Sequence, residues 1–568
     1  MKIFGKLKIS LYICNVKTKK EQNMENNGFI SVNTLGAGAN NARTENGAIS
    51  YNTFGNALMD QFGKAGVYRG RAIEDVWAEQ NVLWAENPEF ALKFPFYLRM
   101  ITRQSNVTGQ NKTEKVQRGA GARDESFKRL LWIAKYHPEE FYRNLWLLPV
   151  VGSWKDLWTL LSFDGALEYL DERKFFEVIA EGINDNSCRD LVKKYMPRIR
   201  STKQCKTKWA KNTNMLAKHF ADAAGWSFKD YRTYKSSGEA HTFQKMICKG
   251  LYSNINWKCI PGKALLNLVS GKFLANHNLE DAYYAWIKSQ PVAKFNGYAF
   301  ELGRKLGMTK YGITKTNRLT RITVDKQFDG LIATASKNAG AIQGNVLCAL
   351  DTSGSMGGPA LDKSGTTPFH VCISLGIYFS ELNQGAFHNT VAMFDDTSRL
   401  LKLKGKTFSD KWNEIVSQQT AWGSTNFQSV IDLIVDTRRK HPEIPLEDFP
   451  STLLVVSDMQ FNPSASYYNR VSEQTNYETA MNKLRSVFPS EFVDGFKIVW
   501  WHCSNRTTKD FPSTMEHGGT YMFSGYDGSI VSFLLGGDTV VNSDNKAMPT
   551  MEDIINAAFN QEVITMIR

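Results

Sequence analysis

The stretch that decides the fold is Asn345-Val-Leu-Cys-Ala-Leu-Asp351, which continues as Thr352-Ser-Gly-Ser355. Its apolar run, residues 346–350, is typical of a short strand that is buried on both faces of a parallel sheet. The run ends in a carboxylate, and two serine hydroxyls follow at alternating positions on a tight turn. The carboxyl ends of parallel strands lie at one edge of a sheet, where open α/β folds bind their ligands. The stretch therefore predicts a buried strand with a ligand site at its end.

Strands and helices alternate along the rest of the chain. The strands expected after the first one are residues 390–394, 452–457 and 496–502 and a short strand near Tyr521. The helices expected between and after them are residues 369–382, 408–416, 427–438, 477–487 and 551–558. Such alternation predicts a doubly wound α/β domain with a mostly parallel sheet over residues 340–568.

The chain before residue 335 is predicted to be mostly helical. Residues 73–84 and 127–134 carry apolar side chains at helical spacing, and each run is followed by a proline that opens a second helix. These prolines, Pro88 and Pro138, are 50 residues apart, near the period of helical hairpins that stack into solenoids. Two copies are also compatible with coincidence. We expect an N-terminal α-helical, HEAT-like repeat body over residues 41–335, after a disordered or extended segment at residues 1–40.

The composition, with 42% hydrophobic and 22% charged residues over 568 positions, is that of a globular protein of several domains. It excludes the disordered, collagen-like and disulfide-rich classes. Eight cysteines, without a CxxC pair or a Cys/His cluster at zinc spacing, argue against a disulfide framework and a structural zinc site. No run of 18 apolar residues occurs, so no membrane-spanning helix is expected. These features predict a reducing, cytoplasmic setting.

The amino terminus has some features of a targeting segment. Lysines near the start of the chain precede a short apolar run, residues 9–16. That run has no small-residue cleavage site, which argues against a signal peptide. Met24 is an alternative start, which would leave residues 1–23 as a disordered extension.

The net charge of +13 is concentrated in two stretches that contain no acidic residue. Residues 191–221 contain Lys193, Lys194, Arg198, Arg200, Lys203, Lys206, Lys208, Lys211 and Lys218. Residues 302–324 contain Arg304, Lys305, Lys310, Lys315, Arg318 and Arg321. A basic field of this kind is expected on a surface that binds a polyanion such as nucleic acid. A merely solvated face would usually mix acidic residues with the lysines.

We take these basic residues, apart from Lys218, as candidate RNA contacts, a choice that rests on charge alone. Tyr195 and Trp209 in the first stretch and Tyr311 in the second can stack on bases while the cations follow the backbone. For Trp209, a position in the core beside its helix is an equally good interpretation.

Two later segments add polar groups to the first turn. Gly423-Ser-Thr-Asn426 stands at the start of a predicted helix, and Ser457-Asp458 closes the predicted strand 452–457. Together with the first turn they provide an all-oxygen set with two carboxylates, which suits a hard cation that keeps some waters and an open position. The candidate metal ligands are Asp351, Ser353, Ser355, Thr425 and Asp458, and the expected cofactor is Mg²⁺ or another divalent cation.

The pattern Asp351-x-Ser353-x-Ser355, with Thr425 and Asp458 on later elements, resembles the metal-ion-dependent adhesion site of a von Willebrand factor A domain. The resemblance implies that Asp458 binds the metal through water, and that the other four residues bind it directly or through water. It also implies that a carboxylate from a partner protein fills the open position. The alternative is a site kept only for its fold-stabilising hydrogen bonds, without an external ligand.

A helical body followed by an A-type domain resembles the Ro/TROVE architecture, in which helical repeats close into a ring. The chain is more similar still to a Ro-like family of unassigned function found in plants, microbes and viruses. The matching phrases span about residues 40–565 and lie at residues 44–51, 123–127, 137–138, 152–157, 290–294, 351–356, 422–427, 456–461 and 523–525. Ro proteins hold single-stranded ends of misfolded RNA in the central hole and small structured RNAs outside, so the resemblance implies RNA binding.

We therefore expect a ribonucleoprotein scaffold, not an enzyme, that grips structured RNA with a single-stranded end and uses its A-type domain for partner recruitment or ring closure. The alternative is a metal-dependent protein-interaction or assembly component without RNA. A hydrolase is disfavoured, because a lone Mg²⁺ needs a positioned base or a second metal. His370 has nothing to pair with and fits a satisfied histidine better. No Ser/His/Asp set at nucleophile-elbow spacing and no phosphate-binding loop occurs.

Overall fold

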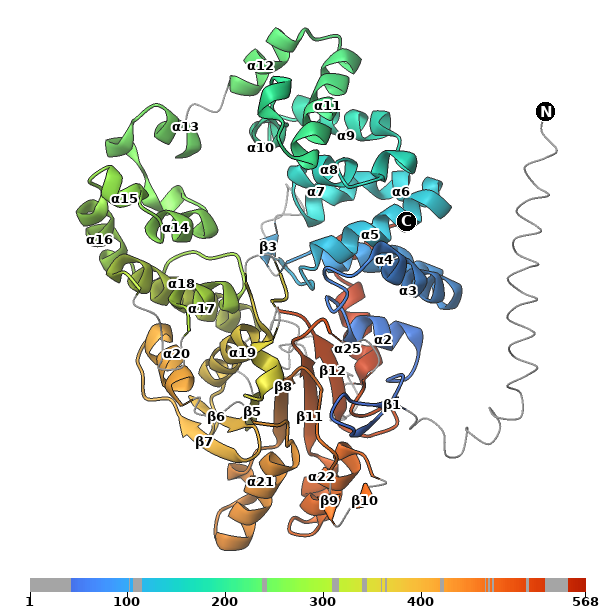
Figure 1. The fold of residues 1–568 in the computed structure, drawn as a ribbon, viewed down its shortest axis with the longest axis vertical. Coiled ribbons are helices and arrows are strands. Elements are labelled where there is room, and N and C mark those ends of the chain that lie inside the picture. Colours follow the sequence, from blue (N-terminus) through green and yellow to red (C-terminus); the bar gives the residue numbers. More distant parts are fainter. Residues whose placement is uncertain are drawn as a thin grey trace, which may run out of the picture.

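The computed structural model describes residues 42–101, 103–105, 115–237, 243–308, 316–339, 345–358, 360–362, 365–418, 423–464, 466–467, 470–471, 474–506, 510–526 and 550–568. The segment expected to be disordered or extended, residues 1–40, and the alternative start at Met24 lie outside them. Within these residues the chain is rich in helix and contains one large sheet, which confirms the α plus α/β class. The helices leave the α/β domain, follow a curved path and return to it (Figure 1).

A six-stranded sheet with the order β12-β11-β8-β5-β6-β7 forms the centre of the α/β domain. The strands are β5 (Val346–Asp351), β6 (Thr390–Phe394), β7 (Ser398–Lys402), β8 (Thr452–Ser457), β11 (Lys497–His502) and β12 (Thr520–Ser524). All neighbours pair in parallel except β6 and β7, which are antiparallel. The strand order reverses between β5 and β8, so their carboxyl ends flank the position where such sheets bind ligands.

The buried strands agree with the sequence prediction, and the edge strand does not. β6 and β8 have the predicted bounds, and both are buried along their whole length, which explains their apolar runs. The sequence pattern does not predict β7. Its side chains are only partly buried at the edge of the sheet, so Ser398–Lys402 needs no continuous apolar run.

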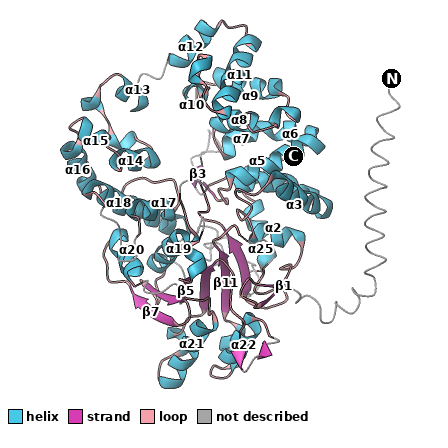
Figure 2. Cartoon of the chain, viewed as in Figure 1, coloured by secondary structure: helices cyan, strands magenta, loops and turns pink. Residues whose placement is uncertain are grey.

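Helices flank the sheet (Figure 2). They are α19 (Pro368–Leu382), α20 (Phe408–Ser417), α21 (Gln428–Lys440), α22 (Asn476–Arg485), α23 (Ser490–Asp494), α25 (Met551–Phe559) and α26 (Glu562–Thr565). α19 packs on β5, β6 and β8, whereas α21 packs on β6 and β7. The five helices predicted for this domain are present with ends close to the expected positions.

The helical part is formed by α2 (Ala57–Gly63), α3 (Ile73–Glu86), α4 (Pro88–Arg99), α5 (Arg123–Tyr136), α6 (Pro138–Asn144), α7 (Leu148–Val151), α8 (Trp154–Leu161), α9 (Glu172–Asn184), α10 (Arg189–Tyr195), α11 (Lys208–Ala223), α12 (Phe228–Ser236), α13 (Phe243–Cys248), α14 (Gly262–Val269), α15 (Phe273–Asn276), α16 (Glu280–Ser289), α17 (Ala299–Leu306) and α18 (Arg318–Ala339). Three short antiparallel strand pairs lie outside the large sheet. They are β1 (Ala42–Arg43) with β2 (Ile49–Ser50), β3 (Arg103–Ser105) with β4 (Lys115–Gln117), and β9 (Ser466–Tyr467) with β10 (Arg470–Val471).

The two proline-marked helix pairs are present as predicted. Pro88 and Pro138 stand at the start of α4 and α6, where a proline removes no intrahelical hydrogen bond. The Asn87 side chain caps α4 by accepting a hydrogen bond from the Phe90 amide at 2.9 Å. α3 packs on α4 and α5, and α4 packs on α5, so these helices bury their apolar faces against one another.

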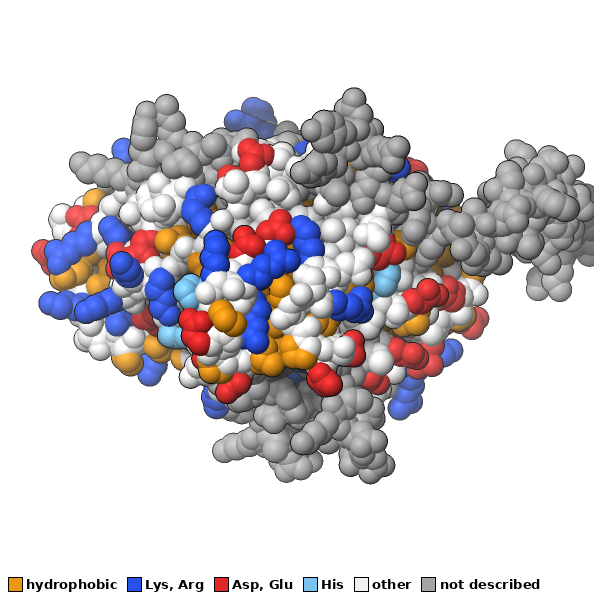
Figure 3. All heavy atoms as spheres, turned by 90° about the horizontal axis from the view of Figure 1, so that it is seen from below, with side chains coloured by type: hydrophobic (Ala, Val, Ile, Leu, Met, Phe, Trp, Pro, Cys, Tyr) orange, Lys and Arg blue, Asp and Glu red, His pale blue; other side chains and the backbone are white. Residues whose placement is uncertain are grey.

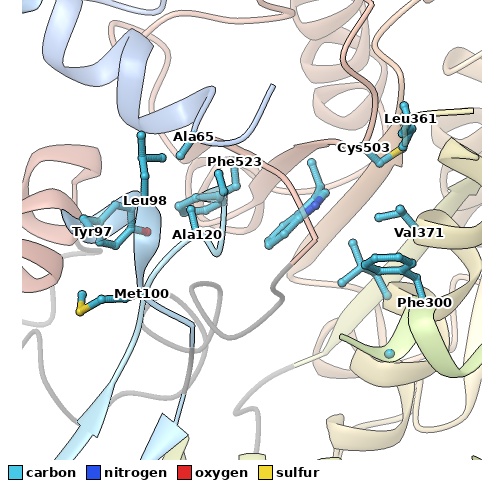
Figure 4. Close-up of a cluster of buried hydrophobic side chains, with 14 of the residues drawn as sticks. Ala65, Tyr97, Leu98, Met100, Ala120, Phe300, Leu361, Val371, Cys503 and Phe523 are labelled. Atoms are coloured by element: carbon cyan, nitrogen blue, oxygen red, sulfur yellow. The ribbon is translucent and has the colours of Figure 1, made fainter. Parts of the chain in front are cut away.

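The helical part and the α/β domain share one hydrophobic core. Figure 4 shows Tyr97, Leu98 and Phe300 of the helical part in the same buried cluster as Val371 and Phe523 of the α/β domain. α17 approaches α20 closely because Gly303 has no side chain, and a Cβ there would lie 2.2 Å from the Trp412 ring.

The carboxyl terminus returns to the helical part. The ring of Phe559, at the end of α25, lies 4.3 Å from the Phe90 ring and 5.3 Å from the Tyr97 ring, measured between centroids. Asn144 then exchanges two hydrogen bonds with the backbone of Arg568, at 2.6 and 2.9 Å. The last helices therefore connect the sheet to α4 and α6.

Within the residues that the structure describes, no helix is both long and apolar enough to cross a membrane. Every cysteine in this part of the chain is free, as expected from the cysteine spacing.

We expect Phe559→Ala to lower the free energy of unfolding by about 3–5 kcal/mol, because it removes a buried ring from an aromatic cluster. Chemical denaturation followed by tryptophan fluorescence measures the change. Phe228→Ala is the control, since this ring is 37% exposed and should contribute much less. Equal effects of the two substitutions would contradict a role of Phe559 in joining the two parts.

Candidate functional site

Asp351 is the buried end of the central strand β5. Its carboxylate accepts hydrogen bonds from the Ser353 amide at 2.9 Å and from the Ser457 hydroxyl at 2.5 Å. After Ser353 a 3-10 helix, Gly354–Gly357, turns the chain so that the Ser353 and Ser355 hydroxyls lie 3.1 Å apart. This turn therefore directs one carboxylate and two hydroxyls to the same edge of the sheet.

The other two predicted ligands lie at the same edge. The Gly354 amide donates to the Gly423 carbonyl at 3.0 Å, which holds the loop that carries Thr425 beside the first turn. Thr425 is buried, and its carbonyl accepts a hydrogen bond from the Asn462 amide at 2.9 Å. Asp458 directly follows β8, the neighbour of β5 in the sheet. The structure thus brings all five predicted positions together, while their role as ligands stays a prediction.

The two buried carboxylates are electrostatically unfavourable neighbours. Burial, followed by the negative charge of Asp458, raises the pKa of Asp351 to about 7. Burial also raises the pKa of Asp458, although the Ser355 hydroxyl and the Gln460 amide act in the opposite direction. Asp458 Oδ2 is buried and has no hydrogen-bond partner among the described residues. Such an oxygen, beside a second carboxylate, is a position that a cation would satisfy.

The donor set fits a hard divalent cation. Two carboxylates and three hydroxyls are oxygen ligands of the kind that Mg²⁺ prefers. They carry too few charges to replace all of its waters, so a bound cation would keep some of them. No group of three or more His, Cys, Asp or Glu side chains at metal-binding distance occurs in the described part of the chain. A site of the softer kind, such as a zinc site, is therefore not found among those residues.

Four residues at the rim of this site were not singled out by the sequence analysis. The side chain and carbonyl of Gln460 bind the amide of Glu45 and the side chain of Asn46, both at 2.6 Å. Arg506, on the loop after β11, lies 3.5 Å from the Glu45 carboxylate. The pairing joins residues more than 400 positions apart, and no local pattern in the sequence indicates it.

His370 is buried and hydrogen-bonded, as the sequence analysis expected of a satisfied histidine. Its Nδ1 lies 2.8 Å from the Thr367 hydroxyl at the start of α19. Burial is the main reason why its pKa is lowered to about 4.

Some residues of the first basic stretch contact other groups of the protein, and others are exposed. Lys193 is buried, 4.2 Å from the centre of the Tyr234 ring, and is therefore not available to RNA, contrary to the expectation from charge alone. Lys208 forms an exposed ion pair with Asp164 at 2.6 Å. Trp209 is 50% exposed, so the interpretation as a core residue is wrong.

The exposed remainder of this stretch lies before and at the start of α11. Arg198, Lys203, Lys206 and Lys211 are exposed and form no ion pair with a described residue. Lys194 and Arg200 are half-buried. We refer to Lys203, Lys206, Lys211 and Trp209 as the α11 patch.

Most described basic residues of the second stretch contact other side chains of the protein. Arg304 contacts Thr366 at 3.1 Å, and Arg321 contacts Asp410 at 2.8 Å, so both join the helical part to the α/β domain. Lys305 binds Asn267 and Ser270, each at 3.1 Å. The Arg318 guanidinium lies 4.0 Å from the centre of the Tyr284 ring. These four residues therefore contact other protein groups, and their role as RNA contacts stays a prediction. Lys310, Lys315 and Tyr311 lie outside the described residues.

Comparisons with known proteins identify relatives without a stated function. Residues 345–565 match the model of a domain of unknown function, DUF7788. The chain is 23% identical to the uncharacterized protein L728 of Acanthamoeba polyphaga mimivirus over 537 aligned residues. The alignment covers 88% of this chain and 85% of the viral protein. The domain match begins one residue before β5 and contains the whole site, and the viral similarity extends over both parts of the chain.

We expect Asp458→Asn to stabilise the metal-free protein. At pH 8 the substitution removes one of two buried like charges that act on each other. The free energy of unfolding in EDTA should rise by about 1–3 kcal/mol. Asp494→Asn, which is exposed at the end of α23, is the control and should stay within about 0.5 kcal/mol. A less stable Asp458→Asn protein would contradict the repulsion between the two carboxylates.

Proposed function

We propose that the protein is an RNA-binding, Ro-like scaffold, with a TROVE-type ring of HEAT-like helical repeats and a von Willebrand factor A domain. The observation that carries the proposal is the α11 patch, in which a half-exposed tryptophan is close in sequence to exposed lysines that form no ion pair with a described residue. An exposed indole offers a face on which a base can stack, and exposed lysines can neutralise the phosphates of a bound strand. The free cysteines are compatible with the cytoplasmic setting that we propose for it.

The distribution of charge supports this proposal. Basic and acidic side chains are interspersed on the end of the molecule seen in Figure 3. By contrast, residues 191–221 contain basic but no acidic residues, and the lysines of the α11 patch have no acidic partner among the described residues. A concentrated positive field favours a polyanion over a neutral partner.

The expected RNA is structured and has a single-stranded end. Stacking needs unpaired bases, because the bases of a duplex are already stacked on one another. Binding of a hairpin with an unpaired tail can be compared with binding of the same hairpin with a blunt end. The comparison separates base stacking from contacts to phosphates.

We expect Trp209→Ala to weaken binding of the tailed hairpin by roughly 1–3 kcal/mol and to leave the blunt hairpin almost unchanged. Fluorescence anisotropy at several salt concentrations measures both. Trp146→Ala is the matched control, because Trp146 is 46% exposed and lies on a different helix. Equal losses from both tryptophans would contradict a stacking role of the α11 patch.

We expect the triple substitution of Lys203, Lys206 and Lys211 to alanine to weaken binding of both hairpins and to reduce its salt dependence. Each contact to a single-strand phosphate contributes about 0.7 to the slope of log affinity against log salt, so the slope should fall by about 2. The control replaces Lys404, Lys406 and Lys440, which are exposed in the α/β domain. An unchanged slope would remove the basis for RNA binding by this patch.

The second candidate function is metal-dependent binding of a protein partner, and it is favoured by the unsatisfied Asp458 Oδ2. In this proposal Mg²⁺ is held by Asp351, Ser353, Ser355, Thr425 and Asp458, and a carboxylate from the partner takes the open position. The sheet order and the buried carboxylates at the ends of β5 and β8 support a von Willebrand factor A domain. The proposed role is binding, not catalysis.

We expect Mg²⁺ to stabilise the protein against thermal unfolding, and EDTA to reverse the effect. A cation present at a hundred times its Kd raises the free energy of unfolding by about 2.7 kcal/mol. Asp351→Ala should abolish this stabilisation, whereas Asp494→Ala should retain it. A protein whose unfolding does not respond to Mg²⁺, Mn²⁺ or Ca²⁺ would contradict the metal site.

A further inference from the structure

A strap from outside the α/β domain lies across the rim of the metal site. We define the strap as residues 42–51, which include the β1–β2 hairpin. The Thr44 hydroxyl donates to the Phe461 carbonyl at 2.7 Å, and the Glu45 amide donates to the Gln460 side chain at 2.6 Å. Gln460 and Phe461 belong to the loop that directly follows Asp458. The position of Glu45 is therefore fixed against the loop that carries the second carboxylate.

Arg506 reaches the same rim from another loop. Its Nη2 lies 3.5 Å from Glu45 Oε2, and its Nη1 lies 3.8 Å from the position that a Cβ on Gly358 would take. Gly358 directly follows the turn that holds Ser353 and Ser355. The charge of Arg506 lowers the pKa of Asp458 and that of Glu45 raises it, so both side chains are within electrostatic range of this carboxylate. The guanidinium thus stands between an acidic partner on the strap and the acidic site.

Two features make Arg506 a competitor of the expected metal ion. A guanidinium is a good partner for a carboxylate, and Asp458 Oδ2 is a buried carboxylate oxygen without a hydrogen-bond partner among the described residues. The Arg506 side chain is 36% exposed, so no close contact on all sides prevents it from turning. A guanidinium bound to Asp458 would repel a divalent cation from the same oxygen.

We propose that Glu45 holds Arg506 away from Asp458, and that this ion pair keeps the carboxylate site open for a divalent cation. The inference rests on the proposed metal site. Glu45 acts as a positioning residue, since it works through Arg506 and not as a ligand. Release of the strap frees Arg506 to enter the site and to lower its affinity for the cation.

The strap also connects the Glu45–Arg506 ion pair to the helical part. The chain continues from the strap through α2 to Gly66, whose amide donates to the buried Glu125 carboxylate of α5 at 3.0 Å. Arg71 then donates to the Arg506 carbonyl at 2.6 Å, and its own carbonyl accepts from Lys128 of α5 at 2.6 Å. α5 is therefore hydrogen-bonded to the segment that follows the strap and, through Arg71, to the backbone of Arg506.

The test is a double-mutant cycle on Mg²⁺ affinity, measured by isothermal titration calorimetry with the full chain and the metal alone. We expect Arg506→Gln to bind Mg²⁺ roughly three- to tenfold more tightly, because it removes the competing cation. Glu45→Gln should bind it weaker by a similar factor. In the Arg506→Gln background, the further change Glu45→Gln should have little effect, since its target is gone.

Two matched substitutions control for net charge. Glu491 and Arg485 are exposed and lie on the segments that lead into the amino end of β11, at the opposite edge of the sheet from the site. Glu491→Gln and Arg485→Gln should leave the Mg²⁺ affinity unchanged. Circular dichroism of each variant confirms that it is folded.

The outcomes separate the inference from the metal site on which it rests. If the wild type does not bind Mg²⁺, the proposed metal site fails, and the inference fails with it. If the wild type binds Mg²⁺ through Asp351 but Arg506→Gln and Glu45→Gln do not change the affinity, only the inference is overturned. Equal weakening by Glu45→Gln in both backgrounds would also overturn it, because Glu45 would then act directly on the cation.

Discussion

The parallel pairing of β5 with β8 is the constraint on which the site depends. The register aligns Leu350 with Val456, so Asp351 and Asp458 follow at the same edge of the sheet. Both strands are central and fully buried, and the two carboxylates are therefore removed from water where they end. A buried pair of like charges is stable only with a bound proton or a cation. Burial and the charge of Asp458 raise the pKa of Asp351, which favours a bound proton. In our proposal a cation is the alternative, with the surrounding hydroxyls as its ligands.

A buried ion pair of opposite charges holds the first helices of the helical part together. Arg129 and Glu125 of α5 are fully buried and lie 3.0 Å apart, and Arg129 also donates to Gln61 and Gln80. Loss of one partner of such a pair typically costs about 3–5 kcal/mol, because the other charge stays buried without compensation. Glu125 also binds the backbone of Gly66, which follows α2. The pair therefore holds the segment between the strap and α3 in one position.

The basic residues of the chain have two separate uses. In α17 and α18 they contact acidic or polar groups of other elements, and Arg304 and Arg321 thereby connect the helical part to the α/β domain. Around the start of α11, Lys208 pairs with Asp164, whereas Lys203, Lys206 and Lys211 are exposed and have no acidic partner in the described structure. A count of charges along the sequence treats both stretches alike, because it contains no information on which carboxylates lie nearby in space.

The sequence by itself determined the class of the fold, the central strands, the flanking helices, the proline-marked helix pairs and the five polar positions of the candidate metal site. Each of these follows from a local pattern, because the spacing of the apolar residues in a segment indicates which of its faces is buried. The edge strand β7, the exposure of Trp209, the burial of Lys193 and the pairing of Glu45 with Arg506 were decided only by the tertiary structure. These features depend on which distant segments contact one another, and the contact between the strap and the rim of the site joins the two ends of the chain. Only the folded chain brings those charges together, because their attraction in water is too weak and too screened to specify the pairing beforehand.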